Sequence, residues 1–235
     1  MTKSEVLKLL KEHQNERGVA YWQKLGPEAN GLKSFGIGLT RLRKLAKGVG
    51  RDHKLAQQLW KSEYYDARVM GILIDDPKEI TREQVEQQVE DLNVGMLSHV
   101  YASCDAPLSK APFVKDLAKE WVDNKDDMRR RCGYLLLYEL SKDKKKKSDL
   151  DDDFFLEYIR RIRDSIVNEE NWVKDAMNVA LMGIGKRNLK LNQEAIKVAK
   201  NVGRVDVDYG DDNSCEPLEV LKHLTSDYLK KKLGI

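Results

Sequence analysis

The stretch from 34 to 76 sets a pattern of hydrophobic and polar positions that the rest of the chain repeats. Its first part carries four apolar side chains at i, i+3, i+4 and i+7, which form one stripe of a 3.6-residue period: Leu42, Leu45, Ala46 and Val49. Basic side chains fall on the opposite side or at its border: Arg41, Arg43, Lys44, Lys47 and Arg51. This part is predicted to form an amphipathic basic helix, and a second short helix follows it.

The third part of the stretch is apolar almost all round and must be buried against neighbours: Tyr64, Tyr65, Val69, Met70, Ile72, Leu73 and Ile74. The same pattern returns in 128–140 and 172–184. A charged helix laid over a buried one, repeated along the chain, is typical of an α-solenoid. Because such pairs cannot bury their apolar faces alone, we predict an all-α superhelix of HEAT-like helix pairs that forms a single domain over 1–235.

The remaining helices are expected from their periodicity, their capping residues and the glycines and prolines between them. The first is expected to begin with Ser4 as its N-cap, and a capping box at 81–84 opens another. Further helices are expected at 94–104, 111–122, 126–140, 154–167, 172–184, 191–202 and 217–232. The lysines and then aspartates of 141–153 are interpreted as a solvated connector. Residues 203–210 alternate in polarity but are short and bounded by glycines, so they are interpreted as an extended loop or small hairpin. A calcium loop is not favoured for the aspartates there, because the EF-hand glycine is out of place and no glutamate closes the loop.

Composition and charge narrow the class of protein. Charged residues make up 34% of the chain and aromatic residues 7%, which is typical of long solvated helices, and the net charge of +3 does not by itself identify a nucleic-acid binder. Three cysteines without a CxxC spacing and four scattered histidines predict neither a disulfide framework nor a metal site. The first helix has no signal-peptide pattern, and no apolar run is long enough to span a bilayer. We therefore predict a cytoplasmic protein with no cofactor and no membrane partner.

Several segments, in this order and spacing, carry a family resemblance. They are Phe35-Gly36-Ile37, Leu42-Arg43-Lys44-Leu45, Trp60, Asp66-Ala67-Arg68, Met128-Arg129-Arg130-Arg131 and Trp172-Val173-Lys174-Asp175-Ala176. Over roughly 5–200 the sequence resembles the DNA alkylation repair family, the HEAT-like-repeat alkylpurine DNA glycosylases. The resemblance implies a C-shaped stack of helix pairs whose concave, basic face holds duplex DNA. Active members excise cationic N3- or N7-alkylated purines.

The chain departs from this family at the positions of its catalytic residues. Active members place a tryptophan and an aspartate one helical turn apart, with a second tryptophan from a later helix, to hold the cationic base and stabilise the developing charge on the sugar. The resemblance puts these positions on Val94, Ser98 and Val179. None of these side chains supplies the expected electrostatics. No catalytic residue is therefore assigned, and excision is predicted to be weak or absent.

The predicted DNA contacts are basic side chains. They are Arg41, Arg43, Lys44, Lys47, Arg51, Arg68 and Arg131. Arg131 matches the arginine that contacts the backbone near the lesion in the family. Arg68 has an alternative, which is to pair with Asp66 or another acid.

Three functions remain open at this point. The first is a member of the family that binds duplex or branched DNA. The second is an active 3-methyladenine or 7-methylguanine glycosylase whose carboxylate is displaced, with Asp91 and Asp105 as candidates. The missing Trp and Asp argue against it. The third is a HEAT-like scaffold for protein partners, against which the basic helix argues.

Overall fold

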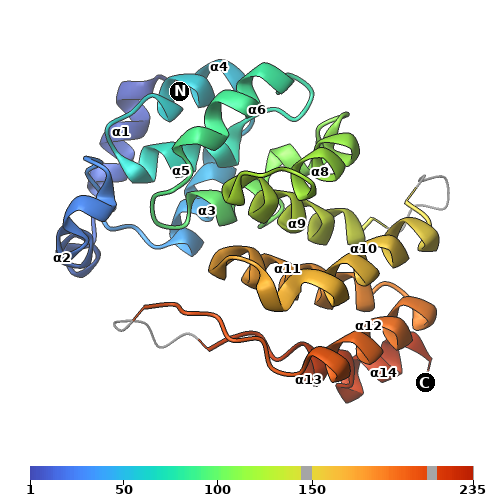
Figure 1. Ribbon diagram of the computed structural model, residues 1–235. Helices are drawn as coiled ribbons and strands as arrows, with labels where there is room; N and C mark the ends of the chain where they lie inside the picture. The colour runs from blue at the N-terminus through green and yellow to red at the C-terminus, as the bar shows by residue number, and fades with distance from the viewer. Residues whose placement is uncertain (144–149, 211–215, 235) are drawn as a thin grey trace. The chain divides into compact units, whose positions relative to one another are not determined.

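The computed structural model describes residues 1–143, 150–210 and 216–234 (Figure 1). Within these ranges all named elements are helices, and the only β-type contact described is an isolated bridge between Lys33 and Tyr64. The predicted all-α class is confirmed. None of the helices in these ranges combines the length and the hydropathy that crossing a membrane requires.

The chain divides into two compact units, Met1–Val114 and Lys115–Ile235. The first unit contains α1 (Lys3–Glu12), α2 (Glu16–Lys24), η1 (Gly26–Ala29), α3 (Leu39–Val49), α4 (His53–Trp60), α5 (Tyr65–Ile74), α6 (Arg82–Gln88), η2 (Val89–Asp91), α7 (Leu97–Ala102) and η3 (Pro107–Lys110). After α8 (Val114–Val122), which starts at the boundary, the second contains α9 (Asp127–Ser141), α10 (Asp152–Ser165), η4 (Ile166–Asn168), α11 (Asn171–Gly185), α12 (Leu189–Val202), α13 (Val220–Leu224) and α14 (Asp227–Leu233). The prediction of one domain over 1–235 stays a prediction.

In the first unit, α5 is the buried helix that its apolar sequence predicts. It packs against α4, α3, α1 and α7, and most of its side chains from Ala67 onwards are buried. Gly71 allows the close approach of α4, because a Cβ at this position would lie 2.8 Å from the carbonyl oxygen of Ala56. The pairing of an amphipathic helix with a buried one is therefore present as expected.

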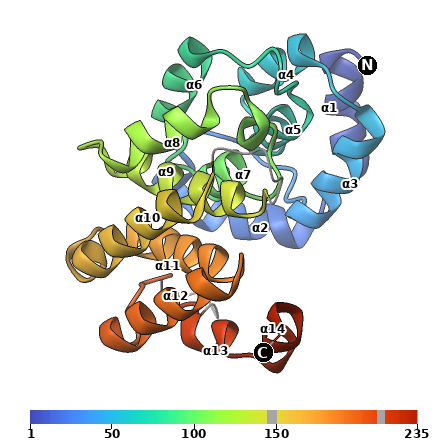
Figure 2. The ribbon, with the colours of Figure 1, turned by 90° about the vertical axis from the view of Figure 1, so that its right-hand side faces the viewer.

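In the second unit, α9 and α11 form the central pair (Figure 2). Helix α12 packs on α10 and α11, and α13 packs on α11 and α12. Gly133 of α9 faces α8, where a Cβ would lie 2.8 Å from the backbone nitrogen of Val122. Both inner helices thus use a glycine at a contact with an outer helix.

Several predicted boundaries were wrong, and local hydrogen bonds explain them. Thr2 is the N-cap of α1 instead of Ser4, because its hydroxyl accepts the Glu5 N–H while the Glu5 carboxylate accepts the Thr2 N–H, in a complete capping box. The segment 217–232 forms two helices, since Ser226 caps a new one. The segment 111–122 is helical from Val114 onwards, and 94–104 only over α7, so that Val94 lies outside the helix.

Of the segments expected between helices, the structure describes 203–210 but not all of the residues in the others. The 203–210 segment contains no strand, in agreement with its interpretation as an extended loop. The lysines and the aspartate at 144–149, together with Asp211, Asp212 and Cys215, lie outside the described residues.

Candidate nucleic-acid interface

A buried carboxylate fixes the start of the basic helix α3. Asp66 is fully buried at the first turn of α5, where it accepts the backbone N–H groups of Phe35 (2.7 Å) and Ile37 (2.9 Å) and the Ser34 hydroxyl (2.8 Å). The loop before α3 is also pressed against α2, because a Cβ at Gly36 would lie 2.3 Å from the Val19 nitrogen, and Gly36 has a φ of +70°. Asp66 therefore serves the loop, and Arg68 does not pair with it.

Three of the predicted basic residues share one exposed face of α3. Arg41, Lys44 and Lys47 are exposed, on the side away from the buried Leu42 and Ala46. No ion pair or hydrogen bond joins these three side chains to another described residue. The N-terminus of α3 also lacks a side-chain cap. Arg41 lies in the first turn of α3, Lys44 in its middle and Lys47 in its last turn, so the three cations form a basic stripe along the exposed face of the helix.

The other basic residues of the first unit are engaged in internal contacts. Arg43 donates to the carbonyl oxygen of Cys104 (3.2 Å) and pairs with Asp105 (3.5 Å). Arg51 donates to the carbonyl oxygens of Leu73 (2.7 Å) and Asp75 (3.0 Å), at the C-terminal end of α5.

Arg68 takes the alternative role that the sequence left open. It donates to the carbonyl oxygen of Ser62 (3.1 Å), lies over the Trp60 ring and pairs with Asp91 at 3.8 Å. Its partner acid is thus Asp91 and not Asp66.

Two of the positions that the resemblance gives to the family's catalytic residues, Val94 and Ser98, are buried. Val94 is 1% exposed and Ser98 0% exposed, and the Ser98 hydroxyl has no hydrogen-bond partner among the described residues. Gly95, between them, has a φ of +53° and lies against the ring of Tyr65, whose hydroxyl accepts the Met96 N–H (3.1 Å). Because Val94 precedes α7, the expected i, i+4 relation within one helix does not exist.

The remaining family position and the two alternative acids offer no substitute site. Val179 is half-buried on α11. Asp91 and Asp105 are each paired with an arginine, Arg68 and Arg43 respectively. Nowhere along 1–143, 150–210 and 216–234 do three or more His, Cys, Asp or Glu side chains gather as a metal site.

In the second unit, Arg131 forms the centre of a cation–aromatic cluster. Its guanidinium lies 4.7 Å from the centre of the Trp172 ring, at the start of α11, and Trp172 is 41% exposed. Burial lowers the pKa of Arg131 below its ordinary value, with smaller opposing effects from Cys132, Asp175 and Tyr209. The Nε of Arg131 is buried and has no hydrogen-bond partner among the described residues. This side chain is therefore a buried cation whose hydrogen-bonding capacity is unfilled.

The segment that follows α12 is fastened beside this cluster. The Asn171 side chain donates to the Asp208 carbonyl oxygen and accepts the Asp208 N–H, both at 2.7 Å. Tyr209 packs edge-on against Trp172, with ring centres 5.6 Å apart, and its hydroxyl donates to Asp175 (2.7 Å). These contacts place an aromatic pair and a carboxylate next to Arg131.

The neighbouring arginines of α9 have structural roles. Arg130 pairs with Asp127 (2.6 Å) and Glu169 (3.1 Å) and donates to the carbonyl oxygens of Asn124 and Lys125. Arg129 pairs with Asp126, the N-cap of α9. Of this run, Arg131 is the residue without a described hydrogen bond or ion pair.

The sequence alone did not single out Asn171, Asp175 or Tyr209. Tyr209 lies 34 residues from the Asp175 that it contacts. The tyrosine of an extended loop gives no periodic signal. The available signal was the alternation of 203–210, which suggested an extended segment but not its docking site.

The described helices pack in pairs and define a class of all-helical repeat proteins. Residues 6–209 match the family of DNA alkylation repair enzymes, and the chain belongs to this family.

Two proteins and a solved structure are similar to this chain. The uncharacterized proteins Lin0241 of Listeria innocua and Lmo0209 of Listeria monocytogenes are each 24% identical to the chain over 202 residues, which cover 82% of this chain and 83% of theirs. A solved structure is similar over 100% of this chain and 97% of its own, with a TM-score of 0.82 and 22% identity. It is described as a new family of proteins related to the HEAT-like repeat DNA glycosylases with affinity for branched DNA structures. At this identity the likeness shows the fold.

Proposed function

We propose that this protein binds DNA, with a preference for branched structures, and that its alkylpurine glycosylase activity is weak or absent. The observation that carries the proposal is Arg131, a buried guanidinium over Trp172 with an unpartnered Nε. The Nη groups of Arg131 have no described hydrogen-bond partner and, unlike the Nε, are not among the atoms sealed from solvent, so a phosphate oxygen can accept from them. The proposed role of Arg131 is therefore to contact the DNA backbone.

The exposed face of α3 supports the same function. Arg41, Lys44 and Lys47 offer three cations without partners among the described residues, at the spacing of one helix face. Such contacts neutralise phosphates and release counterions, so that they strengthen binding without reading the sequence. By contrast, Arg43, Arg51 and Arg68 are engaged within the first unit, and their proposed contribution to DNA binding is smaller.

The preference for branched DNA rests on the similar solved structure, whose family is described as having affinity for branched DNA. The Trp172–Tyr209 pair gives this preference a physical basis. Trp172 is partly exposed beside a cation, and the exposed or unstacked bases at a junction can pack on aromatic side chains. A continuous duplex offers no such base without unstacking.

The test compares a three-way junction with a linear duplex of equal length by fluorescence anisotropy. The wild-type protein is expected to bind the junction more tightly. Arg131→Gln is expected to weaken junction binding about tenfold, since a charge-assisted hydrogen bond contributes about 1.5–3 kcal/mol. Arg160→Gln serves as the matched control, because Arg160 is exposed on α10 of the same unit and has no described partner. Equal affinities for both DNAs, or equal effects of both variants, would argue against the proposal.

Excision of methylated bases is expected to stay near the spontaneous rate. Val94 and Ser98 are buried, and the Arg131 charge next to Asp175 opposes binding of a cationic base there. Losing one preorganised electrostatic contact costs about 3–4 kcal/mol of transition-state stabilisation. The substitutions Val94→Trp and Ser98→Asp are expected to destabilise the fold instead of restoring activity. The first overpacks a buried site, and the second buries a charge.

The measurement is release of 7-methylguanine and 3-methyladenine from alkylated DNA. Release far above the spontaneous background would support the active-glycosylase alternative. The carboxylates to replace would then be Asp91, Asp105 and Asp175. A protein that neither binds DNA nor releases bases would support the scaffold alternative.

A further inference from the structure

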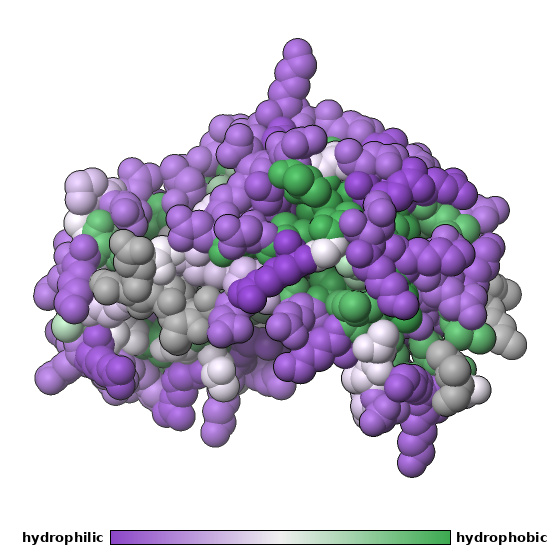
Figure 3. Space-filling view, turned by 60° about the horizontal axis from the view of Figure 1, so that its bottom comes forward, coloured by the Kyte–Doolittle hydropathy of each residue, from purple (hydrophilic) through white to green (hydrophobic). Residues whose placement is uncertain are grey.

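The second unit contains a cavity that the proposed DNA contacts do not use. It has a volume of about 540 Å³ and lies between the end of α10, helices α11 and α12, and the segments 202–205 and 218–225. Figure 3 shows hydrophobic surface bordered by hydrophilic side chains on the face where α12 and α13 lie. Most of the lining is aliphatic, including Ile162, Ile166, Leu181, Val198, Leu218 and Leu221. Both the volume and the apolar lining are those of small-molecule sites.

The one buried polar side chain in the lining of this cavity has no partner among the described residues. Asn178 of α11 is 3% exposed and lines the cavity, and no hydrogen bond joins its amide to another described residue. The amide has no partner in the described chain and is not among the atoms sealed from solvent, so its polar atoms are accessible from the cavity that Asn178 lines. The amide is therefore well placed to bond a ligand that carries an acceptor or a donor.

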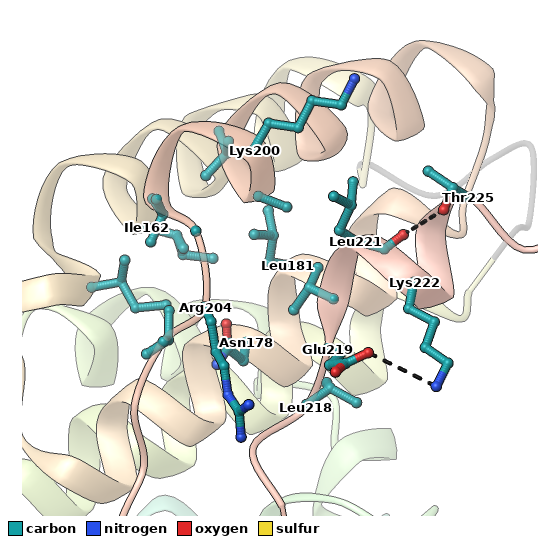
Figure 4. Close-up of a pocket in the computed structure, with 17 residues that line it drawn as sticks. Ile162, Asn178, Leu181, Lys200, Arg204, Leu218, Glu219, Leu221, Lys222 and Thr225 are labelled. Carbon is teal, nitrogen blue, oxygen red and sulfur yellow. Dashed lines mark hydrogen bonds and ion pairs between the residues drawn. The ribbon is translucent and has the colours of Figure 1, made fainter.

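The charges at the edge of the cavity favour an anion. Arg204 and Lys200 are exposed lining residues without a described ion pair, while Glu219 is paired with Lys222 at 3.8 Å. Because Lys222 compensates the single carboxylate of the lining, the remaining charge is positive. In Figure 4 Arg204 and Asn178 lie at the same end of the cavity, and Lys200 extends from the other.

We propose that this cavity binds an amphipathic carboxylate, with its hydrocarbon chain among the aliphatic side chains and its head at Arg204 and Asn178. The Arg204 guanidinium and the Asn178 amide N–H donate to the carboxylate oxygens. Each methylene that enters the cavity adds favourable burial, and the head group gains a charge-assisted contact. A hollow of this kind suits a slender chain better than a flat protein face, which would leave the amide unpartnered.

The test is a calorimetric titration with dodecanoate below its micelle-forming concentration. Dodecan-1-ol and dodecyltrimethylammonium serve as neutral and cationic ligands of the same chain length. The wild-type protein is expected to bind one dodecanoate, at least tenfold more tightly than either comparison ligand. A rise in the thermal unfolding midpoint with dodecanoate concentration should accompany binding.

Three variants locate the site. Arg204→Gln is expected to remove the preference for the carboxylate while binding of the alcohol persists. Leu221→Trp is expected to block all binding by filling the cavity, and Leu189→Trp, at an equally exposed leucine outside the lining, should bind as wild type does. The proposal is overturned if dodecanoate does not bind saturably. It is equally overturned if the three ligands bind alike, or if Arg204→Gln leaves the preference unchanged.

Discussion

At the scale of single residues, two buried charges have opposite surroundings. Asp66 is fully buried and accepts three hydrogen bonds from the loop before α3. Arg131 is largely buried over Trp172, and its Nε has no described partner. A carboxylate that receives all of its donors from the chain holds the fold together, whereas a guanidinium with an unfilled donor is available to a ligand. Asp66 and Arg131 come from two motifs that carry the family resemblance, and these two motifs therefore have different roles.

Replacing Asp66 by Asn tests the structural role of the first charge. The new amide group would turn a donor towards the N–H of Phe35 or Ile37, so one contact becomes a clash of donors. We expect the free energy of unfolding to fall by about 3 kcal/mol, the range for losing buried hydrogen bonds to a charged group. Urea denaturation measures this change. Asp206→Asn, at an exposed carboxylate without a described partner, should change the free energy of unfolding little. Equal effects of the two substitutions would contradict the structural role of Asp66.

At the scale of elements, glycines decide how closely paired helices approach. A Cβ at Gly71 of α5 would lie 2.8 Å from the Ala56 carbonyl oxygen, whereas at Gly48 of α3 nothing lies within 4 Å. Both glycines are in helices, so alanine gains about 1 kcal/mol of helix propensity at either position. Only at Gly71 must the neighbouring backbone move to make room. The same substitution should therefore have opposite effects on stability at the two sites.

Gly71→Ala is expected to lower the free energy of unfolding by up to about 2 kcal/mol, since overpacking costs about 1–3 kcal/mol and the propensity gain of about 1 kcal/mol offsets part of it. Gly48→Ala is expected to raise it by about 0.5–1 kcal/mol. Urea denaturation midpoints at one temperature separate the two outcomes. Stabilisation by both substitutions would mean that α5 and α4 are not in close contact at Gly71.

The elements themselves could be predicted from the sequence, because burial of one face imposes a 3.6-residue period. Helix ends were less predictable, since a single hydroxyl decides them, as at Thr2 and Ser226. Contacts between distant residues left no periodic trace. The docking of Asp208 on Asn171 joins residues 37 apart, and the cluster around Arg131 depends on it. Arg131 itself could be named from the resemblance, but its unfilled donor became visible only in the structure.

At the scale of the whole molecule, the chain has the fold and family of the DNA alkylation repair enzymes, while Val94 and Ser98, two of the three positions that the resemblance gives to the catalytic residues, are buried. Its net charge of +3 is small, so nucleic-acid binding depends on where the cations lie and not on their number. The face formed by Arg41, Lys44 and Lys47 is such a local concentration. We infer a protein that retains the DNA-binding role of the family scaffold without its excision chemistry.

The most direct measurement of this claim is a salt titration of junction binding by wild-type protein and by Lys44→Glu/Lys47→Glu. The control is Lys8→Glu/Lys11→Glu, which reverses two exposed lysines at the same spacing on α1. We predict that the α3 variant binds at least tenfold more weakly at low salt. The slope of log affinity against log salt concentration should become shallower by about 2, because each lost phosphate contact removes about 0.9. Unchanged affinity and slope in the α3 variant, or equal losses in the control, would contradict the account.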